Sequence, residues 1–437
     1  MVRVEGITND VTTSRNYETL RRTFREYYFR HGKNIEYPKA INQREFGLRY
    51  FGSNGEPAKM IRHLTFKNEG EILATAIREI PSDFYCSNAY YRFPSFPMQE
   101  KEWLGADLIF DIDAKDMHLP CQPSHSYSIC DGCLHAFRNT KGVDRCELCG
   151  SQNLVLESIP CKRCFEGTKS EVQKLHDMLI DEFGIHEESI HIYFSGNEGF
   201  HLYVTDSSFL SLDAQARSDM SGYILGKGLM PETIGVYRRI RRIDGNKRSS
   251  TTINNREGIF DGTVYGPGFH NTSPNSFDKE NDQRDFLIKL SRSSLKYGWR
   301  KRLLQKLGIK NFSETRLSNI VQQNGGYSGF KTELDKIGKE LGINIDPQVT
   351  MDIHRIFRMP GTLNSKSGLA KMKCSDLKSF DPLNEACLVG GELIKIRANA
   401  TVKFTLKEQE FHVEKKITFL PAYAAIYLVC KRLATVV

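Results

Sequence analysis

The chain has 437 residues, of which 39% are hydrophobic and 11% aromatic, ordinary values for a globular protein of two or three domains. Lysine and arginine number 61, against 53 aspartates and glutamates. This modest excess permits a nucleic-acid or phosphate partner but does not establish one. No apolar run reaches the length of a membrane span, and the N-terminal residues lack the apolar core of a signal peptide. We therefore expect a cytoplasmic protein with no membrane attachment.

The predicted elements in the first part of the chain lead up to one acidic strand. Residues 17–28 carry apolar side chains at helical spacing. Apolar alternation in residues 44–51 and 60–66 predicts two strands of a mixed sheet. A third strand, residues 106–113, ends in two aspartates separated by one isoleucine.

Asp111 and Asp113 are expected to share one face of this strand, because strand side chains alternate between faces. Two neighbouring carboxylates suit a hard divalent cation such as Mg²⁺, which binds one or two carboxylates together with substrate phosphates. The alternative is a strand that runs into an acidic turn.

Seven of the 11 cysteines lie between Cys121 and Cys164, mostly in CxxC pairs. In a reducing compartment this pattern indicates metal binding rather than disulfides. Two of the pairs have the spacing of a tetrahedral zinc ribbon, and an Fe–S cluster is the less favoured alternative. The four expected ribbon ligands are Cys130, Cys133, Cys146 and Cys149.

A third pair, Cys161 and Cys164, needs two more ligands to form a second zinc site. Closed sets of four protein ligands leave no position for substrate, so both sites are expected to be structural. The best candidates for the missing ligands are Cys121 and His125, with His118 and His135 as substitutes for the histidine.

A helix over residues 170–184 and two strands over residues 188–206 are expected next. The strands flank a turn that begins with Ser195 and Gly196, and His201 lies on the second strand. Glycines in such a turn let backbone N–H groups approach phosphate oxygens. A glycine-rich hairpin with a buried histidine would explain the pattern equally well.

Residues 207–342 are more polar, and strongly basic at residues 237–242. The basic run is interpreted either as a contact to a nucleic-acid backbone or as the solvated face of a helix. Residues 285–308 and 332–342 are predicted to be helical. The apolar tail, residues 417–433, is predicted to be a core helix.

A late motif adds charge to the acidic pair. Asp346 is expected to end a strand and to supply a third carboxylate ligand, although an aspartate before proline is also a common turn residue. Three cations that follow are placed to neutralise a triphosphate, or are surface charges: Arg355, Arg358 and Lys366.

Taken in order, the motifs FDID, the cysteine pairs, FSGNEGFH and IDPQVTMDIHRIFRMPGTLNSKSG resemble the small, catalytic subunit of the archaeal/eukaryotic-type DNA primase. The resemblance extends from REFG at Arg44 to the apolar tail. It implies an α/β fold, an α+β mixed sheet, in which the primase catalytic core is related to the RNA-recognition fold and carries an inserted zinc-binding module and a helical insertion.

The resemblance also implies residue roles. Asp111, Asp113 and Asp346 would hold two Mg²⁺ or Mn²⁺ ions, and Ser195 and His201 would contact the phosphates of the incoming nucleotide. Arg358 matches a family cation at the nucleotide. Two residues of the early strands, Glu45 and Arg62, resemble family residues near the nucleotide.

The chain departs from the family at three positions of the expected phosphate site. Eukaryotic members have arginines where Asn197 and Glu198 stand, so part of the phosphate contact must come from elsewhere or be weaker. Many members have histidine at the position of Asn364, and an amide donates a hydrogen bond but no positive charge. The Cys130–Cys149 ribbon is an addition to the family's single zinc module.

The expected domains are a catalytic core (residues 1–120 and 165–206, with a C-terminal part at 343–437), a zinc-binding insertion (121–164) and a basic, helical insertion (207–342). The expected activity is primer synthesis from nucleoside triphosphates on single-stranded DNA during replication, with a large primase subunit as partner. The alternatives are a primase-related repair or translesion polymerase, and a zinc-ribbon nucleic-acid-binding subunit without catalysis.

Overall fold

The computed structural model describes residues 3–52, 58, 60–139, 143–239, 284–289, 298–309 and 313–437, with side chains from residue 14 onward. The chain divides into two compact units. Unit 1 comprises Met1–Ser221 and Asn344–Val437, and unit 2 comprises Gly222–Ile343. Both helices and antiparallel sheets are present, so the expected mixed α/β class is confirmed.

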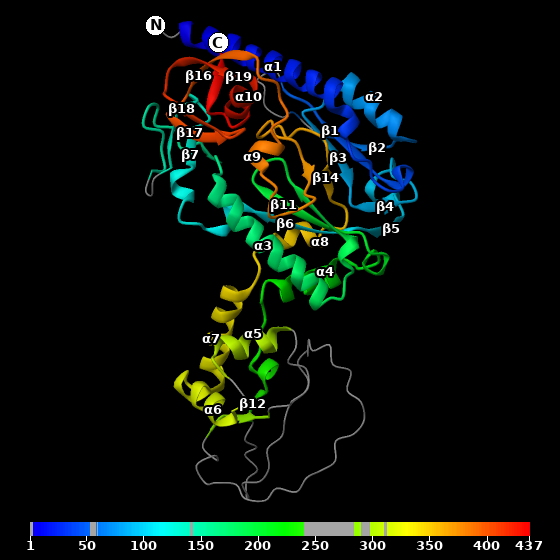
Figure 1. The fold of residues 1–437 in the computed structure, drawn as a ribbon, viewed down its shortest axis with the longest axis vertical. Helices are drawn as coiled ribbons and strands as arrows, with labels where there is room; N and C mark the ends of the chain where they lie inside the picture. Colours follow the sequence, from blue (N-terminus) through cyan, green and yellow to red (C-terminus); the bar gives the residue numbers. More distant parts are fainter. Residues whose placement is uncertain are drawn as a thin grey trace, which may run out of the picture. The chain divides into compact units, whose positions relative to one another are not determined.

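The first sheet of unit 1 has the strand order β14-β3-β1-β2 (Figure 1). Its strands are β1 (Phe46–Arg49), β2 (Ile61–Leu64), β3 (Asp83–Ser87) and β14 (Ile356–Arg358). Two helices belong to the same part of the chain and pack against each other: α1 (Arg3–His31) and α2 (Glu69–Glu79). The side chain of Asn68 caps α2 by accepting a hydrogen bond from the backbone of Glu71. The helix and the two strands predicted for this region are confirmed.

The second sheet has the order β15-β10-β11-β6 and contains the acidic strand. Its strands are β6 (Leu108–Asp113), β10 (Ile190–Phe194), β11 (Gly199–Val204) and β15 (Met372–Lys373). Helix α3 (Lys162–Asp181) packs against β6 and β11. The apolar side chains that α3 buries, among them Val172, Leu175 and Leu179, recur at helical spacing.

Three smaller groups of strands complete unit 1. A hairpin joins β4 (Ala89–Tyr91) to β5 (Trp103–Ala106), and the cysteine-rich segment forms a sheet of β7 (Ser126–Cys130), β8 (Ala136–Arg138) and β9 (Leu154–Ser158). The C-terminal segment forms β16 (Leu393–Ala398), β17 (Val402–Leu406), β18 (Gln409–Val413), β19 (Ile417–Pro421) and β20 (Ala434–Val436). Four further helices are α4 (Ala214–Ile224), α8 (Pro347–Met351), α9 (Pro382–Glu385) and α10 (Ala422–Cys430).

The described residues of unit 2 form a strand pair and three helices around their own apolar core. The elements are β12 (Val236–Arg238), β13 (Phe286–Ile288), α5 (Gly298–Lys306), α6 (Glu314–Gln323) and α7 (Gly326–Leu341). The fully buried side chains of this core include Leu303, Leu317, Phe330 and Leu334.

Two predictions of secondary structure were wrong in part. The helix predicted over residues 285–308 begins only at Gly298 among the described residues, because Phe286–Ile288 pair with β12 as a strand. In the tail, Ile417–Pro421 form strand β19, and Pro421 immediately precedes α10. The basic run at residues 237–242 begins in β12, and its residues 240–242 lie outside the described residues.

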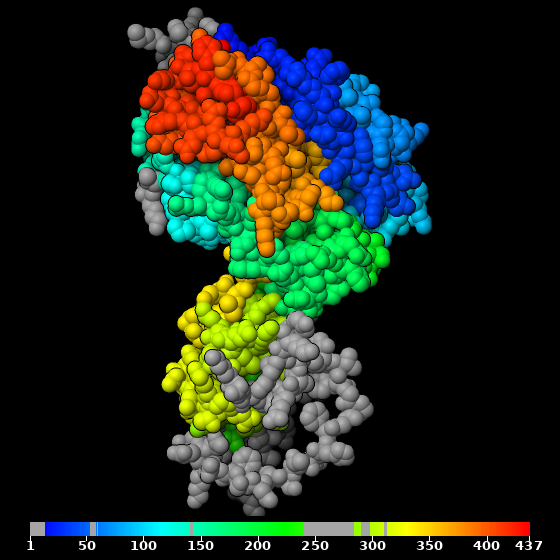
Figure 2. Space-filling view, in the orientation of Figure 1, coloured from blue at the N-terminus to red at the C-terminus, as the bar shows by residue number. Residues whose placement is uncertain are grey.

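Within the part of the chain that the structure describes, no helix is long and apolar enough to cross a membrane. Space-filling atoms of the C-terminal segment, coloured orange to red, form a continuous surface of unit 1 beside the blue N-terminal helix (Figure 2).

Residues 207–221 belong to unit 1, although the expected insertion begins at residue 207. The physical reason is Arg217, which is fully buried and donates hydrogen bonds to the backbone carbonyls of Ala106, Asp107 and Leu212 at 2.7–3.1 Å. Burial lowers the pKa of Arg217 to about 10, so the guanidinium remains charged at neutral pH.

We expect Arg217→Met to lower the free energy of unfolding of unit 1 by about 3 kcal/mol, because three buried carbonyls lose their donors. Urea unfolding followed by the fluorescence of Trp103, in a Trp299→Phe background, measures this change, since these are the two tryptophans of the chain.

The matched control is Arg78→Met on the exposed end of α2, where Arg78 pairs only with the neighbouring Glu79. A surface change of this kind shifts stability by roughly 0.5 kcal/mol or less. Equal effects of the two substitutions would show that Arg217 does not hold residues 207–221 to unit 1.

Candidate active site and metal centres

The acidic strand β6 pairs antiparallel with β11, and this register assembles the expected site. Asp111 lies opposite His201, and Asp113 lies opposite Gly199. The His201 Nε2 atom is 3.4 Å from Asp111 Oδ1. The side chains of Asp111 and Asp113 are 17% and 23% exposed, so both carboxylates remain accessible at the surface of the sheet.

Asp346 does not end a strand, and that prediction was wrong. Its side chain caps the short helix α8 by accepting a hydrogen bond from Gln348 N at 2.9 Å, with Pro347 as the first helical residue. The Asp346 N–H donates to the backbone carbonyl of Asp111 at 3.0 Å. Asp346 therefore lies beside β6 because it caps the N-terminus of α8, and not because it ends a strand.

The three carboxylates repel one another. Burial, followed by the charges of Asp113 and Asp346, raises the pKa of Asp111 well above its usual range. Burial also raises the pKa of Asp113, against the opposing charge of Lys115. Among the described residues, Asp111 Oδ1 is buried and has no hydrogen-bond partner. A group of mutually repelling hard oxygen donors of this kind fits divalent cations.

The carboxylates of Asp111, Asp113 and Asp346 are less tightly grouped than the cysteine clusters, whose ligand atoms all lie within 4.8 Å of one another. A looser arrangement is compatible with a pair of ions, because the ions of two-metal sites are about 3.5–4 Å apart.

The turn between β10 and β11 is built around Ser195. Its Oγ atom accepts hydrogen bonds from the backbone N–H groups of Asn197 and Gly199 at 3.4 and 3.3 Å, which leaves the hydroxyl proton available for donation. Gly196 has φ of +85°, and a side chain there would crowd Lys371 and Asn364. The Asn364 amide lies 3.5 Å from the Ser195 carbonyl, so it supports the turn.

Lys371 is a candidate site residue that the sequence reasoning missed. It is fully buried, and its Nζ atom lies 3.2 Å from His201 Nδ1 and donates to the hydroxyl of Tyr203 at 2.7 Å. Burial and the charge of Arg358 lower the pKa of Lys371 to about 7. The residue directly precedes β15, which pairs with β10, but lysines are common in loops and nothing in the local spacing distinguished this one.

The two ring nitrogens of His201 face different groups, Nδ1 toward Lys371 and Nε2 toward Asp111. Burial and the nearby cations lower the pKa of His201 well below its usual range, so the ring is neutral. A protonated Lys371 can only donate to Nδ1, and in that state the ring proton lies on Nε2.

Arg358 is paired inside the protein rather than free to face solvent. Its Nη1 atom donates to Asp83 Oδ1 at 2.5 Å and to the Leu363 carbonyl at 2.8 Å, and its side chain is 9% exposed. Burial opposes ionisation of Asp83, but Arg358 and Ser365 outweigh it and lower the pKa of Asp83. The expected phosphate contact of Arg358 stays a prediction.

Glu45 and Arg62 form an ion pair at 2.8 Å between Nε and Oε1. The Glu45 side chain is fully buried and also lies 3.5 Å from Lys101 Nζ, whereas Arg62 is 34% exposed. A role of this pair at a nucleotide, which stays a prediction, therefore requires contact through Arg62.

Arg355 and Lys366 are the more accessible of the expected cations. Arg355 is partly buried and its charge acts on both Asp111 and His201, which places it near the acidic strand. Lys366 is exposed, and its backbone N–H donates to the Asn364 side chain at 2.9 Å.

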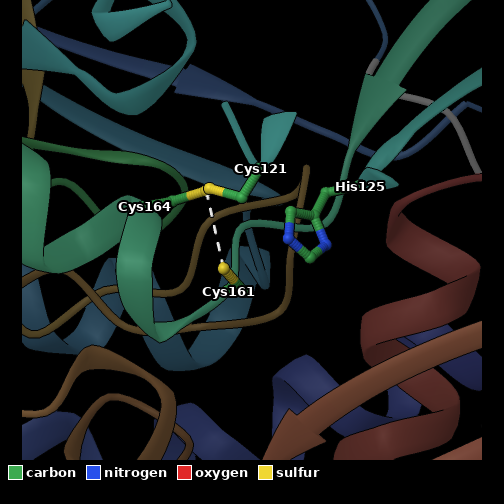
Figure 3. A group of neighbouring side chains, drawn as sticks. All are labelled: Cys121, His125, Cys161 and Cys164. Carbon is green, nitrogen blue, oxygen red and sulfur yellow. Dashed lines mark hydrogen bonds between the residues drawn. The ribbon is translucent and has the colours of Figure 1, made fainter. Parts of the chain in front are cut away.

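The cysteines form the two expected clusters. One contains Cys130, Cys133, Cys146 and Cys149, and the other contains Cys121, His125, Cys161 and Cys164. In Figure 3 the three sulfur atoms of the second cluster lie together beside the His125 imidazole. Four soft or borderline donors at this separation suit tetrahedral zinc.

Local hydrogen bonds at one member of the first cluster, Cys130, favour the thiolate that zinc requires. Burial raises the pKa of Cys130, but backbone N–H donors and the Cys149 thiol lower it to about 6. His135, a substitute ligand in the sequence analysis, instead lies 2.9 Å from Lys415 Nζ. His118 is not a member of either cluster.

Comparison with known proteins matches a family model for the DNA primase small subunit to residues 156–372. Among curated relatives, a DNA primase small subunit of Nitrosopumilus maritimus is 38% identical over 424 residues, covering 95% of this chain and 98% of the relative. Those of Cenarchaeum symbiosum and Methanococcoides burtonii are 35% and 31% identical, with at least 94% of each chain covered. The chain belongs to the family of DNA primase small subunits.

Proposed function

We propose that this chain synthesises short primers on single-stranded DNA by nucleotidyl transfer from nucleoside triphosphates, as a DNA-directed RNA polymerase of the primase type. The observation that carries the proposal is the β6–β11 register, which places the turn at Ser195 and the ring of His201 beside Asp111 and Asp113. Carboxylates for metal and donors for phosphate thus lie on two adjacent strands.

Asp111, Asp113 and Asp346 would hold two Mg²⁺ or Mn²⁺ ions, since the charges of Asp113 and Asp346 act on Asp111 and, among the described residues, Asp111 Oδ1 has no hydrogen-bond partner. When bound, such ions supply charge that activates a 3′-hydroxyl and stabilises the leaving pyrophosphate. Positioning and charge neutralisation supply most of the catalysis of phosphoryl transfer, so no side-chain base is required.

The protein's own groups bind and orient the triphosphate. Ser195 donates its free hydroxyl proton, and Gly196 lets the backbone approach closely. His201 donates from Nε2, because Lys371 holds the other ring nitrogen. Cations near the phosphates complete the contact: Arg355 and Lys366 directly, and Arg358 and Arg62 from their internal ion pairs.

The wider assignment follows from the family. We propose that the core around β6, β10 and β11 is related to the RNA-recognition fold, that residues 121–164 are a zinc-binding insertion, and that unit 2 is the helical insertion, which begins after Ser221 rather than at residue 207. A large primase subunit is the proposed partner, and a cytoplasmic location stays a prediction.

The central test is synthesis on an unprimed single-stranded DNA template, with ribonucleotides or deoxyribonucleotides, with and without the large subunit. We expect the wild-type chain to start chains de novo, and Asp111→Asn to reduce incorporation about 100-fold or more, because one ligand charge at the transition state is removed. Folding and DNA binding should be retained, since asparagine keeps the shape and relieves repulsion within the carboxylate group.

Asp181→Asn is the matched control, because Asp181 is exposed at the end of α3 and outside the site. Normal synthesis by Asp111→Asn would overturn the metal assignment. Elongation of deoxynucleotides without initiation would indicate a repair or translesion polymerase, and DNA binding without any synthesis would indicate a non-catalytic subunit.

We also propose that both cysteine clusters hold structural zinc. Metal analysis of the purified chain should find about two zinc ions, and Cys133→Ser and Cys161→Ser should each lose one of them, since each variant opens a four-ligand site. The matched control is Cys387→Ser, because Cys387 is buried outside both clusters. If the wild-type chain contains one zinc ion, one of the two cysteine clusters does not hold zinc.

A further inference from the structure

Asn197 and Glu198, which stand where eukaryotic relatives are expected to have phosphate-binding arginines, are tied to an internal lysine. Lys431 Nζ donates to Asn197 Oδ1 at 2.8 Å and to Glu198 Oε1 at 2.7 Å. The Lys431 side chain is 0% exposed, so it cannot itself contact a nucleotide in solution. The two turn residues therefore anchor the turn on the protein interior.

Lys431 and Glu198 also contact the sheet β8-β7-β9 beside the first cysteine cluster. We call this sheet and its cluster the first zinc ribbon. Glu157 and Ser158 are the last two residues of ribbon strand β9. The Glu157 carboxylate is 3.9 Å from Lys431 Nζ, and Ser158 forms a side-chain hydrogen bond with Glu198. Burial raises the pKa of Glu157, whereas at Glu198 the charge of Lys431 and the Ser158 bond outweigh burial and lower the pKa. Lys431 thus sits between a ribbon carboxylate and a turn carboxylate.

The residue that follows holds the other side of the ribbon. Arg432 Nη2 donates to Asp131 Oδ1 at 2.5 Å, and Asp131 lies between the ribbon ligands Cys130 and Cys133. Arg432 adopts φ of +58°, uncommon for a residue with a side chain, which sends the two consecutive side chains in different directions. In Figure 2 the red C-terminal surface lies directly against the cyan surface of the ribbon segment.

The turn between β10 and β11 also contacts the acidic strand β6. The Glu198 carbonyl accepts a hydrogen bond from Ala114 N at 3.0 Å, and the charge of Glu198 acts on Asp113. A Cβ at Gly199 would overlap Asp113 and the Ile112 carbonyl. The backbone of Glu198 is thus fixed to the end of β6, and its side chain is fixed to Lys431.

We propose that Lys431 is a positioning residue, which fixes the turn Ser195–Gly199 in its nucleotide-binding shape and joins that turn to the first zinc ribbon through Glu157. This inference rests on the proposed function for the identity of the ligand, a nucleoside triphosphate. The first zinc ribbon thereby supports the proposed phosphate site through strand β9.

Loss of the lysine leaves the buried Glu198 carboxylate and the partly buried Glu157 carboxylate without their shared cation. Breaking a buried pair in this way is strongly unfavourable, because the remaining charge is uncompensated. The turn must then move or take up water, and small displacements of a substrate-positioning group cost orders of magnitude in rate or affinity.

The test compares nucleotide KM and kcat in primed extension for the wild type and Lys431→Met. We expect KM for the incoming nucleotide to rise about 10-fold or more, with a smaller change in kcat, because the turn binds phosphate while the carboxylates stay in place. Lys431→Arg, which keeps the charge, should recover most of the loss. An unchanged KM in folded Lys431→Met would overturn the inference.

Lys416→Met is the matched control, since Lys416 is exposed and, among the described residues, its ammonium pairs with Glu414 of the same C-terminal segment. If Lys431→Met fails to fold, Glu198→Gln keeps the volume and removes the charge of the turn partner. A KM increase of roughly threefold in Glu198→Gln supports the proposal. An unchanged KM in this variant overturns it. Zinc content measured for every variant separates loss of the ribbon from loss of the turn.

The link to the ribbon is tested by a double-mutant cycle of Glu157→Gln and Lys431→Met. Their effects on KM should be non-additive, since both changes act on one network. Additive effects would show that Glu157 does not act on the turn through Lys431, and the proposed link to the ribbon would fail.

The affinity of the wild type and of Lys431→Met for Mg·ATP is measured in parallel by isothermal titration. This measurement distinguishes failure of the positioning role from failure of the proposed primase activity. If the wild type makes no product, the primase proposal fails, while the Lys431→Met affinity still decides the positioning role. Weaker binding supports the role, and equal binding overturns it.

Discussion

The antiparallel pairing of β6 with β11 is the constraint on which the candidate active site depends. It places Asp111 beside His201 and sets Asp113 against Gly199, where any side chain would overlap the acidic strand. The turn that precedes Gly199 is therefore held at a fixed distance from the carboxylates. A shift of the register by one residue would turn both aspartates toward α3 and away from the accessible face.

Buried cations surround this negative centre, and each is already bound inside the protein. Arg358 is paired with Asp83, Lys371 contacts His201 and Tyr203, and Lys431 holds Glu198. Such pairs contribute little net stability, because desolvation offsets much of their attraction. Their evident consequence is geometric, since they hold the turn at Ser195, the imidazole and β14 in fixed orientations around the carboxylates.

Features that depend on short sequence separations could be predicted. The acidic strand follows from alternation over a few residues, and both cysteine clusters follow from CxxC spacing, including the choice of His125 over His118 and His135. Predictions failed where local pattern was ambiguous. Residues 286–288 have a helical period but pair with a distant strand, and Asp346 before proline begins a helix where a strand end was expected.

The sequence by itself thus determined the membership of the two cysteine clusters, the principal strands and helices near them, and the resemblance to primase small subunits. Only the tertiary structure decided which charges meet. Lys371 lies 170 positions from His201, and Lys431 lies 233 positions from Glu198. Local spacing carries no information about such pairs, because they form only when the sheets, the ribbon and the C-terminal segment pack together.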